Sequence, residues 1–285
     1  MKKLKKWLLP AAGVVLAAAV ALTAYLIWGN CAVTVSEYTV TDAEIPAAFG
    51  GFRIVQVSDL HNTEFGKGNR RLLEKIKAAE PDIIVLTGDL LDFYHTDVEV
   101  AADFARDVVQ IAPTYFVTGN HEHRLEEYAL LKVQMEAAGV QVMENETALL
   151  ERDGESITLL GVQDPTFLPG WTREKEKQLL ADAVAALTPE AGYSILLCHR
   201  PNYLADYAAC GVDLAFAGHF HGGQFRVPFL GGLYSPTYGF FPDYDAGVWT
   251  EGDTTLIISR GLGNSAFPLR LNNPPDLVVA ELNCA

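Results

Sequence analysis

Five short polar clusters, each placed where an apolar run ends, constrain the fold of this chain more than any other feature. In chain order they are Asp59-Leu60-His61, Gly88-Asp89-Leu90-Leu91-Asp92, Gly119-Asn120-His121-Glu122, Cys198-His199 and Gly218-His219-Phe220-His221. The first three follow β-branched runs at 53–57, 83–87 and 115–118, which predict buried strands. Because loops leaving strand ends meet in a crevice at one edge of a sheet, these clusters should converge.

The clusters offer carboxylate, amide and imidazole groups, and they contain five of the seven histidines of the chain. Such groups are ligands for hard to borderline divalent cations, namely Mn, Fe, Zn or Mg. Asp89 is the predicted bridge between two ions, because a carboxylate has two oxygens and Gly88 beside it lets the backbone turn sharply. Two ions about 3.5 to 4 Å apart form a hydrolytic centre for in-line attack on phosphorus.

The five clusters resemble the motifs of the calcineurin-like metallophosphoesterase family. That family has D-x-H, G-D-x-x-D, G-N-H-[DE], a lone His and G-H-x-H, and all five are present in this order over residues 59–221. The resemblance implies an α/β fold, a four-layer α/β/β/α sandwich. It also implies a metal-dependent phosphoric ester hydrolase.

The same resemblance assigns roles to individual residues. It implies one ion held by Asp59, His61, Asp89 and His221, and a second held by Asp89, Asn120, His199 and His219. A hydroxide on the metals would attack phosphorus, His121 would protonate the leaving oxygen, and Asp92 would orient His121. An imidazole with a carboxylate partner has its tautomer fixed and its pKa raised, as a general acid requires.

Two further residues are candidate substrate contacts. Arg200 directly follows His199 and could clamp a phosphate oxygen, although an ion pair with one of the many acidic residues is the alternative. His123 could also reach a substrate phosphate. A histidine beside a site is, however, more often a surface group.

The N-terminus predicts a membrane anchor. Four lysines precede an uncharged stretch at 7–28, whose 22 residues would span about 33 Å as a helix, close to the thickness of a bilayer core. Trp7 and Trp28 resemble interfacial anchors, and the lysines should stay cytoplasmic, which places the rest outside the cell membrane. A cleaved signal peptide and a lipoprotein processed at Cys31 are the alternatives. Residues 29–285 are long enough for one domain.

The charge of the chain limits its partners. Four of the 21 basic residues are the N-terminal lysines, so the remainder carries 17 basic and 36 acidic residues, a net charge of −19. This charge disfavours nucleic acid and anionic lipid as partners for a broad face. An anionic substrate must be attracted by metal ions and local arginines.

The remaining pattern predicts alternating strands and helices. Strands are expected at 33–40, 54–57, 83–86, 115–117 and 195–197, and helices at 70–79, 98–111, 128–138 and 174–186. Short C-terminal strands at 248–249, 254–258 and 277–282 suggest a second sheet.

The sequence predicts that Cys198 is an inert core thiol. Cys31 and Cys284 could form a disulfide if the chain is exported.

Within the family, the chain resembles a membrane-anchored bacterial branch. The features shared with it are the lysine-led anchor, Gly222-Gly223-Gln224, Ser259-Arg260-Gly261-Leu262-Gly263 and Pro274-Pro275. That branch usually has Thr where Phe220 stands, and Phe220 cannot donate the corresponding hydrogen bond. The predicted substrate is a phosphodiester or phosphomonoester.

Two alternatives to that function remain open. One is hydrolysis of a lipid-linked pyrophosphate, as in the UDP-diacylglucosamine hydrolases of lipid A synthesis, and the other is a non-catalytic envelope protein that binds metal and phosphate. The aromatic stretch 229–244 either fills the gap between sheets or forms an apolar lip for a lipid chain. Tyr238, Phe240 and Phe241 would make that lip.

Overall fold

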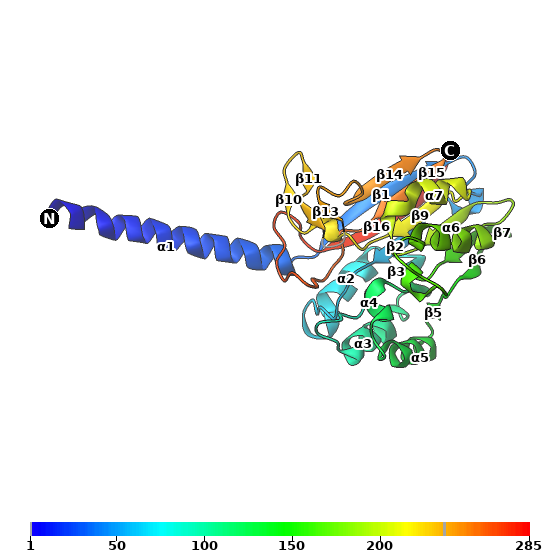
Figure 1. The fold of residues 1–285 in the computed structure, drawn as a ribbon, viewed down its shortest axis with the longest axis horizontal. Coiled ribbons are helices and arrows are strands. Elements are labelled where there is room, and N and C mark those ends of the chain that lie inside the picture. Colours follow the sequence, from blue (N-terminus) through cyan, green and yellow to red (C-terminus); the bar gives the residue numbers. More distant parts are fainter. Residues whose placement is uncertain (1, 236–237) are drawn as a thin grey trace.

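Two six-stranded sheets form the centre of the fold (Figure 1). The computed structural model describes residues 2–235 and 238–285, with side chains from residue 10 onward. The interfacial role predicted for Trp7 and the charges of the four N-terminal lysines therefore lie outside the described side chains. Residues 236–237 of the aromatic stretch lie outside the described part as well.

The first sheet is mainly parallel. Its strand order is β1 (Thr34–Asp42), β16 (Asp276–Cys284), β2 (Phe52–Val57), β3 (Ile83–Thr87), β4 (Thr114–Val117) and β5 (Gln141–Val142). β16 runs parallel to β1 and antiparallel to β2, and the pairs from β2 to β5 are parallel. The carboxyl ends of β2, β3 and β4 therefore lie at the same edge.

The second sheet has a parallel centre with antiparallel edges. Its strand order is β14 (Gly247–Glu251), β15 (Thr254–Ile258), β9 (Leu214–Ala217), β8 (Ser194–Leu197), β7 (Glu155–Gly161) and β6 (Glu146–Arg152). β15, β9, β8 and β7 are parallel neighbours. β6 and β14 close the sheet as antiparallel edge strands.

Helices cover the outer face of each sheet. The α-helices of the domain are α2 (Arg70–Ala78), α3 (Val98–Val108), α4 (Asn120–His123), α5 (Tyr128–Ala138), α6 (Glu176–Leu187) and α7 (Leu204–Ala209). Short 3-10 helices occur at Ala47–Phe49, Lys67–Asn69, Pro165–Phe167, Pro201–Tyr203 and His221–Gly223. α2, α3 and α5 pack on the first sheet, and α6 and α7 on the second.

The alternating direction of side chains along each strand explains why both faces of each sheet are covered. In β3, Val85 joins the core between the two sheets, whereas Ile84 and Leu86 join the core under the helices. Successive side chains of a strand point to opposite faces, so a strand covered on both faces must be apolar at every position. The predicted four-layer α/β/β/α sandwich is confirmed.

One predicted strand belongs to the other sheet. The segment 277–282 was expected in a second, C-terminal sheet, but it lies in β16, between β1 and β2 of the first sheet. β16 is buried on both faces from Asp276 to Ala280, which suits a central position. The second sheet instead begins at β6 and β7, which the pattern of apolar runs did not reveal.

The geometry of β1 and β16 excludes the disulfide considered above. Thr34 pairs with Asp276 at one end of the two strands, and Asp42 pairs with Cys284 at the other. Cys31 lies just before β1, so eight strand steps of about 3.3 Å, roughly 26 Å, separate the two ends. Both thiols are free. Cys198 is buried as expected, and burial raises the pKa of its thiol to about 12.

Two small hairpins and a long helix lie at one side of the domain. The hairpins pair β10 (Arg226–Val227) with β11 (Gly231–Gly232) and β12 (Tyr234–Ser235) with β13 (Gly239–Phe240). α1 (Lys2–Cys31) projects from the same side (Figure 1). Its segment Pro10–Cys31 is long and apolar enough to cross a membrane.

Candidate metal centre

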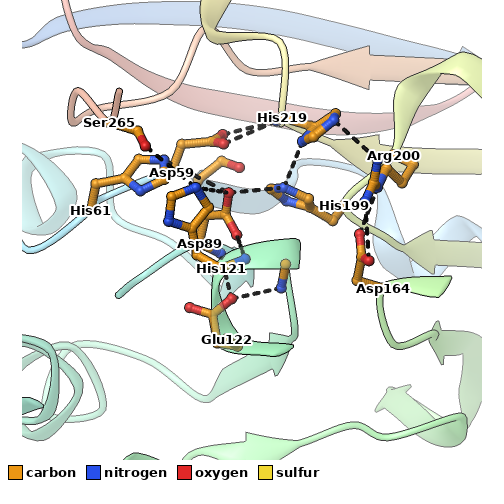
Figure 2. A network of polar contacts seen from close by, with 12 residues as sticks. Asp59, His61, Asp89, His121, Glu122, Asp164, His199, Arg200, His219 and Ser265 are labelled. Carbon is orange, nitrogen blue, oxygen red and sulfur yellow. Dashed lines mark hydrogen bonds and ion pairs between the residues drawn. The ribbon is translucent and has the colours of Figure 1, made fainter. Parts of the chain in front are cut away.

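The five polar clusters converge where strands of both sheets end. Each begins within two residues of the end of β2, β3, β4, β8 or β9. Backbone hydrogen bonds connect the loops: the Asp59 N–H donates to the Gly88 carbonyl at 3.0 Å, and the His219 N–H donates to Asp59 Oδ1 at 3.1 Å. Figure 2 shows the resulting group of imidazoles and carboxylates.

One group of potential ligands consists of Asp59, His61 and His221. One ligand atom from each lies within 4.8 Å of the others. The Nε2 atoms of His61 and His221 are 3.1 Å apart, and His221 Nε2 is 3.4 Å from Asp59 Oδ1. All three side chains are buried. These atoms converge on a single point, as the ligands of one cation do.

A second group consists of Asp89, His199 and His219. His219 Nδ1 is 3.1 Å from His199 Nε2, and His199 Nε2 is 3.2 Å from Asp89 Oδ2. His199 Nδ1 lies 2.8 Å from the Thr87 carbonyl, which accepts its proton and leaves Nε2 free to bind a cation. Asn120 Oδ1 is buried, and the described residues offer it no hydrogen-bond partner.

Asp89 lies between the two groups. Its Oδ2 is 3.7 Å from His61 Nε2 in the first group and 3.2 Å from His199 Nε2 in the second. Its Oδ1 accepts the backbone N–H of His121 at 2.8 Å, which fixes the carboxylate (Figure 2). Asp89 therefore has the position that a bridging carboxylate requires.

The backbone of the centre is strained. Asp59, His61, Asp89, His219 and His221 all have φ between +46° and +72°, in the left-handed region that residues with a Cβ rarely adopt. Gly88 makes the close approach of these loops possible. A Cβ at Gly88 would lie 2.6 Å from the Gly119 nitrogen and 2.8 Å from His199 Nδ1. This motif glycine is therefore required for contact between the loops.

Burial and charge favour metal-binding forms of these side chains. Burial lowers the pKa of His61, His219 and His221, so these rings are neutral and have free lone pairs. Burial alone would raise the pKa of Asp89, but His199, His121 and His61 lower it well below its ordinary value. Burial lowers the pKa of His199, but Asp89 outweighs it and raises that pKa to about 10, so this ring must release a proton when a cation binds.

His121 has a different environment from the other histidines. Its Nδ1 accepts the backbone N–H of Phe93 at 2.9 Å, so the neutral ring carries its proton on Nε2. That Nε2 is 3.3 Å from Ser265 Oγ, at the wall of the cavity. Asp92 Oδ1 is 3.4 Å from Nδ1. Burial lowers the pKa of His121, but Asp89 and Asp92 outweigh it, and the pKa is raised.

Glu122 connects two of the ligand loops. Its carboxylate accepts the backbone N–H groups of Asp89 at 2.9 Å, Gly119 at 2.8 Å and Leu91 at 3.0 Å (Figure 2). Burial, with Asp89 nearby, raises its pKa to about 7, whereas the three hydrogen bonds act in the opposite direction. The G-N-H-E motif contains Glu122, but its part in joining the loops is visible only in the structure.

Arg270 is a functional candidate that the sequence did not reveal. Its side chain is 1% exposed, and no carboxylate of the described residues lies within 4.0 Å of it. Nη2 is 3.2 Å from His221 Nδ1 and donates to the Gly263 carbonyl at 2.5 Å. Burial lowers the pKa of Arg270 to about 10. Contact with His221 places this guanidinium directly behind the metal centre.

The end of α1 is hydrogen-bonded to the loop that carries Arg270. Asn30 Oδ1 accepts the backbone N–H of Arg270 at 2.9 Å and the side-chain N–H of Asn264 at 3.0 Å. Asn264 Oδ1 in turn accepts from Arg270 Nε at 3.0 Å. Two successive contacts, from Asn30 to Arg270 and from Arg270 to His221, thereby link the N-terminal helix to the metal centre. No motif in the sequence pointed to Asn30.

Two connected cavities open at the metal centre. One, of about 240 Å³, is lined by Asp89, His121, His219, His221 and Ser265 among others. The other, of about 360 Å³, is polar and includes Arg124, Arg173 and Arg200 in its wall. Asn120, Arg124 and His219 line both, so the two cavities form one cleft.

The two predicted substrate contacts differ in position. Arg200 is buried and forms a two-point ion pair with Asp164, with Nε to Oδ2 at 2.6 Å and Nη2 to Oδ1 at 3.2 Å (Figure 2). Its Nη1 is 3.3 Å from His219 Nε2. His123 is exposed, and its ring packs against Phe167 at 4.9 Å. The neighbouring residue that lines the cleft is Arg124.

The chemistry of this centre suits divalent cations. The unpartnered Asn120 Oδ1, the two facing imidazole pairs and the ionised Asp89 form a donor set of oxygen and nitrogen. Carboxylate and imidazole ligands match borderline divalent metals. The residues therefore fit metal binding.

Comparison with known proteins identifies the family. Residues 52–223 match the family model described as calcineurin-like phosphoesterase. The chain belongs to the calcineurin-like phosphoesterase family. It is a metal-dependent phosphoester hydrolase, as the five motifs predicted.

Relatives of this phosphoesterase occur in bacteria and in vertebrates. The chain is 31% identical to a Bacillus subtilis protein named uncharacterized metallophosphoesterase YkuE, over 87% of this chain and 84% of that one. It is 27% identical to phosphodiesterase YaeI of Escherichia coli, over 81% and 82%. A Danio rerio transmembrane protein with metallophosphoesterase domain is 28% identical, over 81% of this chain and 54% of that one.

Proposed function

We propose that this phosphoesterase is membrane-anchored and uses two divalent ions to hydrolyse phosphodiesters or phosphomonoesters. The observation that carries the dinuclear proposal is the position of Asp89 Oδ2, 3.7 Å from His61 Nε2 and 3.2 Å from His199 Nε2. The proposed ligands of the first ion are Asp59, His61, Asp89 and His221, and those of the second are Asp89, Asn120, His199 and His219. Mn, Fe, Zn and Mg are the candidate metals.

The protein side chains divide the remaining work. The chemistry that two ions supply in such a site is activation of water and neutralisation of charge on phosphoryl oxygens. Arg124 and Arg200 line the polar cavity beside the centre and add positive charge for the bound phosphate. The ion pair with Asp164 holds the Arg200 guanidinium in a fixed orientation. Bound phosphate is thus oriented from one side of the cleft.

His121 is the proposed general acid. In the charged ring the Nδ1–H faces the Asp92 carboxylate and Nε2 borders the cavity, so the proton that His121 can donate is on Nε2. Asp89 and Asp92 raise its pKa, which keeps the ring protonated when the substrate binds. Donation of this proton to the leaving oxygen completes cleavage of the P–O bond. Asp92 stabilises the charged ring through its carboxylate, 3.4 Å away.

We further propose that α1 crosses the cytoplasmic membrane once, with its N-terminus inside the cell. The supports are the apolar segment Pro10–Cys31 and the lysines that precede it. The catalytic domain would lie outside the membrane. The proposed boundary at residue 28 falls within α1, because the helix continues to Cys31 and Asn30 contacts the domain.

The test uses the full-length protein in detergent, stripped of metal and then resupplied with Mn or Zn. Restored hydrolysis of bis-p-nitrophenyl phosphate or p-nitrophenyl phosphate, with two ions bound per chain, is expected for the wild type. Asp89→Asn should abolish both properties, whereas Asp107→Asn, the same change at an exposed position of α3, should preserve them. One ion per chain in the active wild type would contradict the dinuclear proposal.

A further inference from the structure

An apolar groove lies beside the metal cleft. Its lining residues are Gln224, Phe225, Leu233, Tyr234, Phe240 and Phe267, around a volume of about 280 Å³. Two aromatic pairs form its walls: Phe225 with Phe267 at 5.2 Å between ring centroids, and Tyr234 with Phe240 at 5.3 Å. No polar atom contributes to its accessible surface among the described residues. Such a lining suits hydrocarbon.

The groove borders the metal cavity. Gln224 and Phe267 line both spaces. Gln224 is buried, and its Nε2 donates to the carbonyls of Phe267 at 2.9 Å and Leu269 at 2.7 Å. These bonds hold the two segments of the groove together at the point where it meets the metal cavity. A ligand can therefore reach the centre with one end and the groove with the other.

The groove lies at the membrane side of the domain. The hairpins that form it are on the side from which α1 projects (Figure 1). The Tyr25 hydroxyl of α1 donates to the Asn272 side chain, and Asn272 donates to the Arg226 carbonyl of β10 at 3.2 Å. Two hydrogen bonds thus connect the anchor helix to the hairpin. The groove must open close to the bilayer surface if α1 spans it.

The two hairpins and the residues beside them carry exposed apolar side chains. Phe229 is fully exposed, Leu230 is 68% exposed, Phe240 is 71% exposed and Phe241 is 54% exposed. Side chains of this size are expensive to leave in water, and a bilayer interface would cover them.

The charge of these segments differs from that of the rest of the domain. Residues 222–242 and 260–275 contain no Asp or Glu, in a chain that has 36 acidic residues. Their arginines add little free positive charge, because Arg226 and Arg260 form ion pairs with Asp245 and Asp276 and Arg270 is buried. An acid-free surface can approach anionic head groups, whereas the remaining surface is repelled by them.

We infer that the groove binds a hydrocarbon chain of the substrate, which makes the substrate a membrane lipid with a phosphoester head group. This inference rests on the proposed function, because the head group must reach the metal centre. The hydrocarbon chain enters between the pairs Phe225–Phe267 and Tyr234–Phe240.

The structure also revises the predicted lip: Tyr238 packs on Phe220 at 4.6 Å and lines the polar cavity, so it does not belong to the groove.

The first test measures how kcat/KM depends on chain length. Full-length protein in nanodiscs is given alkyl p-nitrophenyl phosphates with methyl, butyl, hexyl and octyl chains. Each methylene that the groove removes from water should raise kcat/KM about fourfold, once the chain extends past Gln224 and Phe267. Phe240→Ser and Leu233→Ser should lower the octyl-to-methyl ratio. Phe229→Ser, the same kind of change on an exposed side chain outside the groove, should keep it.

The outcomes separate the groove from the catalytic proposal. Hydrolysis of the methyl ester without a rise along the series would overturn the groove and leave the phosphoesterase intact. An equal rise in the wild type and all three variants would also overturn it, because partition into the bilayer would then explain the trend. If the metal-restored wild type hydrolyses neither the methyl ester nor p-nitrophenyl phosphate, the proposed function fails.

A second test needs no catalysis. Octyl phosphate with a diazirine at the chain end is photolysed with the metal-free protein, and the labelled peptides are identified by mass spectrometry. Labelling of peptides that contain Phe225, Leu233 or Phe267, reduced by excess octyl phosphate but not by inorganic phosphate, supports the groove. Labelling confined to α1 or to the polar cavity around Arg200 overturns it, whatever the kinetics show.

Discussion

The two spaces that flank the metal centre differ in both chemistry and construction. The polar cavity has arginines in its wall, and its Arg200 is fixed by Asp164 in a buried ion pair. The apolar groove has aromatic walls, one of them on the two-residue strands β12 and β13, and Phe240 is largely exposed. One side is thus prepared for charge before the substrate arrives. The apolar groove, with Phe240 largely exposed, would be covered only when a hydrocarbon chain binds in it.

The difference between the two spaces would determine how a bound substrate is oriented, with polar groups toward the arginines and hydrocarbon toward the groove. Charged or polar groups would be stabilised on the side of Arg124 and Arg200, where guanidinium groups, that of Arg200 held in place by Asp164, compensate for lost hydration. A hydrocarbon gains nothing there and is favoured in the groove. In the proposed complex the phosphorus atom would lie between the two sides, because the cavity at the metal centre shares Asn120 and His219 with the polar cavity and Gln224 and Phe267 with the groove.

The largest expected effect is a loss of kcat on changing His121, which lines the cavity between the polar cavity and the apolar groove. His121→Ala should lower kcat by roughly 10²- to 10⁴-fold on phenyl phosphate, because the phenolate then leaves without a proton. The loss should be much smaller on p-nitrophenyl phosphate, whose leaving group needs no protonation. Metal content should not change. Steady-state kinetics on the two substrates, with metal analysis, measures this.

The control for that change is two residues away. His123→Ala removes an exposed imidazole that packs on Phe167 outside the cleft, and it should leave both rates within about twofold of the wild type. Equal losses on phenyl and p-nitrophenyl substrates for His121→Ala would argue against a general acid. Such a result would instead indicate disturbed geometry around Asp89.

The next effect tests the rigidity of the polar side. Arg200→Met should destabilise the protein by about 3–5 kcal/mol, because it leaves the fully buried Asp164 carboxylate without its partner. Arg173→Met, a change at an exposed arginine of the same cavity, should stay within about 0.5 kcal/mol. Denaturant unfolding of the two variants in detergent measures the difference. Equal stability would mean that the polar wall is not fixed by its ion pair.

The convergence of the five polar clusters was predictable because the information for it is local. Asp59 and His61, or His219 and His221, lie two residues apart directly after a buried strand, so a short motif contains both the ligands and the turn that presents them. The β-branched runs before them identified β2, β3 and β4 within a few residues. Rigid strands that end at one edge then leave little freedom in where these side chains meet.

The rest of the site was hidden because it depends on contacts between distant segments. Arg270 reaches His221 from 49 residues away, and Asn30 reaches Arg270 from 240 residues away. The groove joins Phe225 to Phe267, and its hairpin strands are too short to show periodicity. The place of β16 in the first sheet is likewise a matter of long-range pairing, which apolar content alone does not specify.

The smallest effect tests how the apolar side is held. Asn30 connects α1 to the loop that carries Asn264, Ser265 and Arg270, and therefore to one wall of the groove and to His221. Asn30→Ala removes the acceptor for two N–H groups and should lower kcat/KM by roughly fivefold, the equivalent of one hydrogen bond. Asn30→Asp keeps that acceptor and should retain most of the activity.

Because the polar cavity does not contact this loop, substrates with long chains should lose more than methyl p-nitrophenyl phosphate. An equal loss for all chain lengths would place the effect of Asn30 at His221 through Arg270, and full activity of Asn30→Ala would show that the anchor does not support the site.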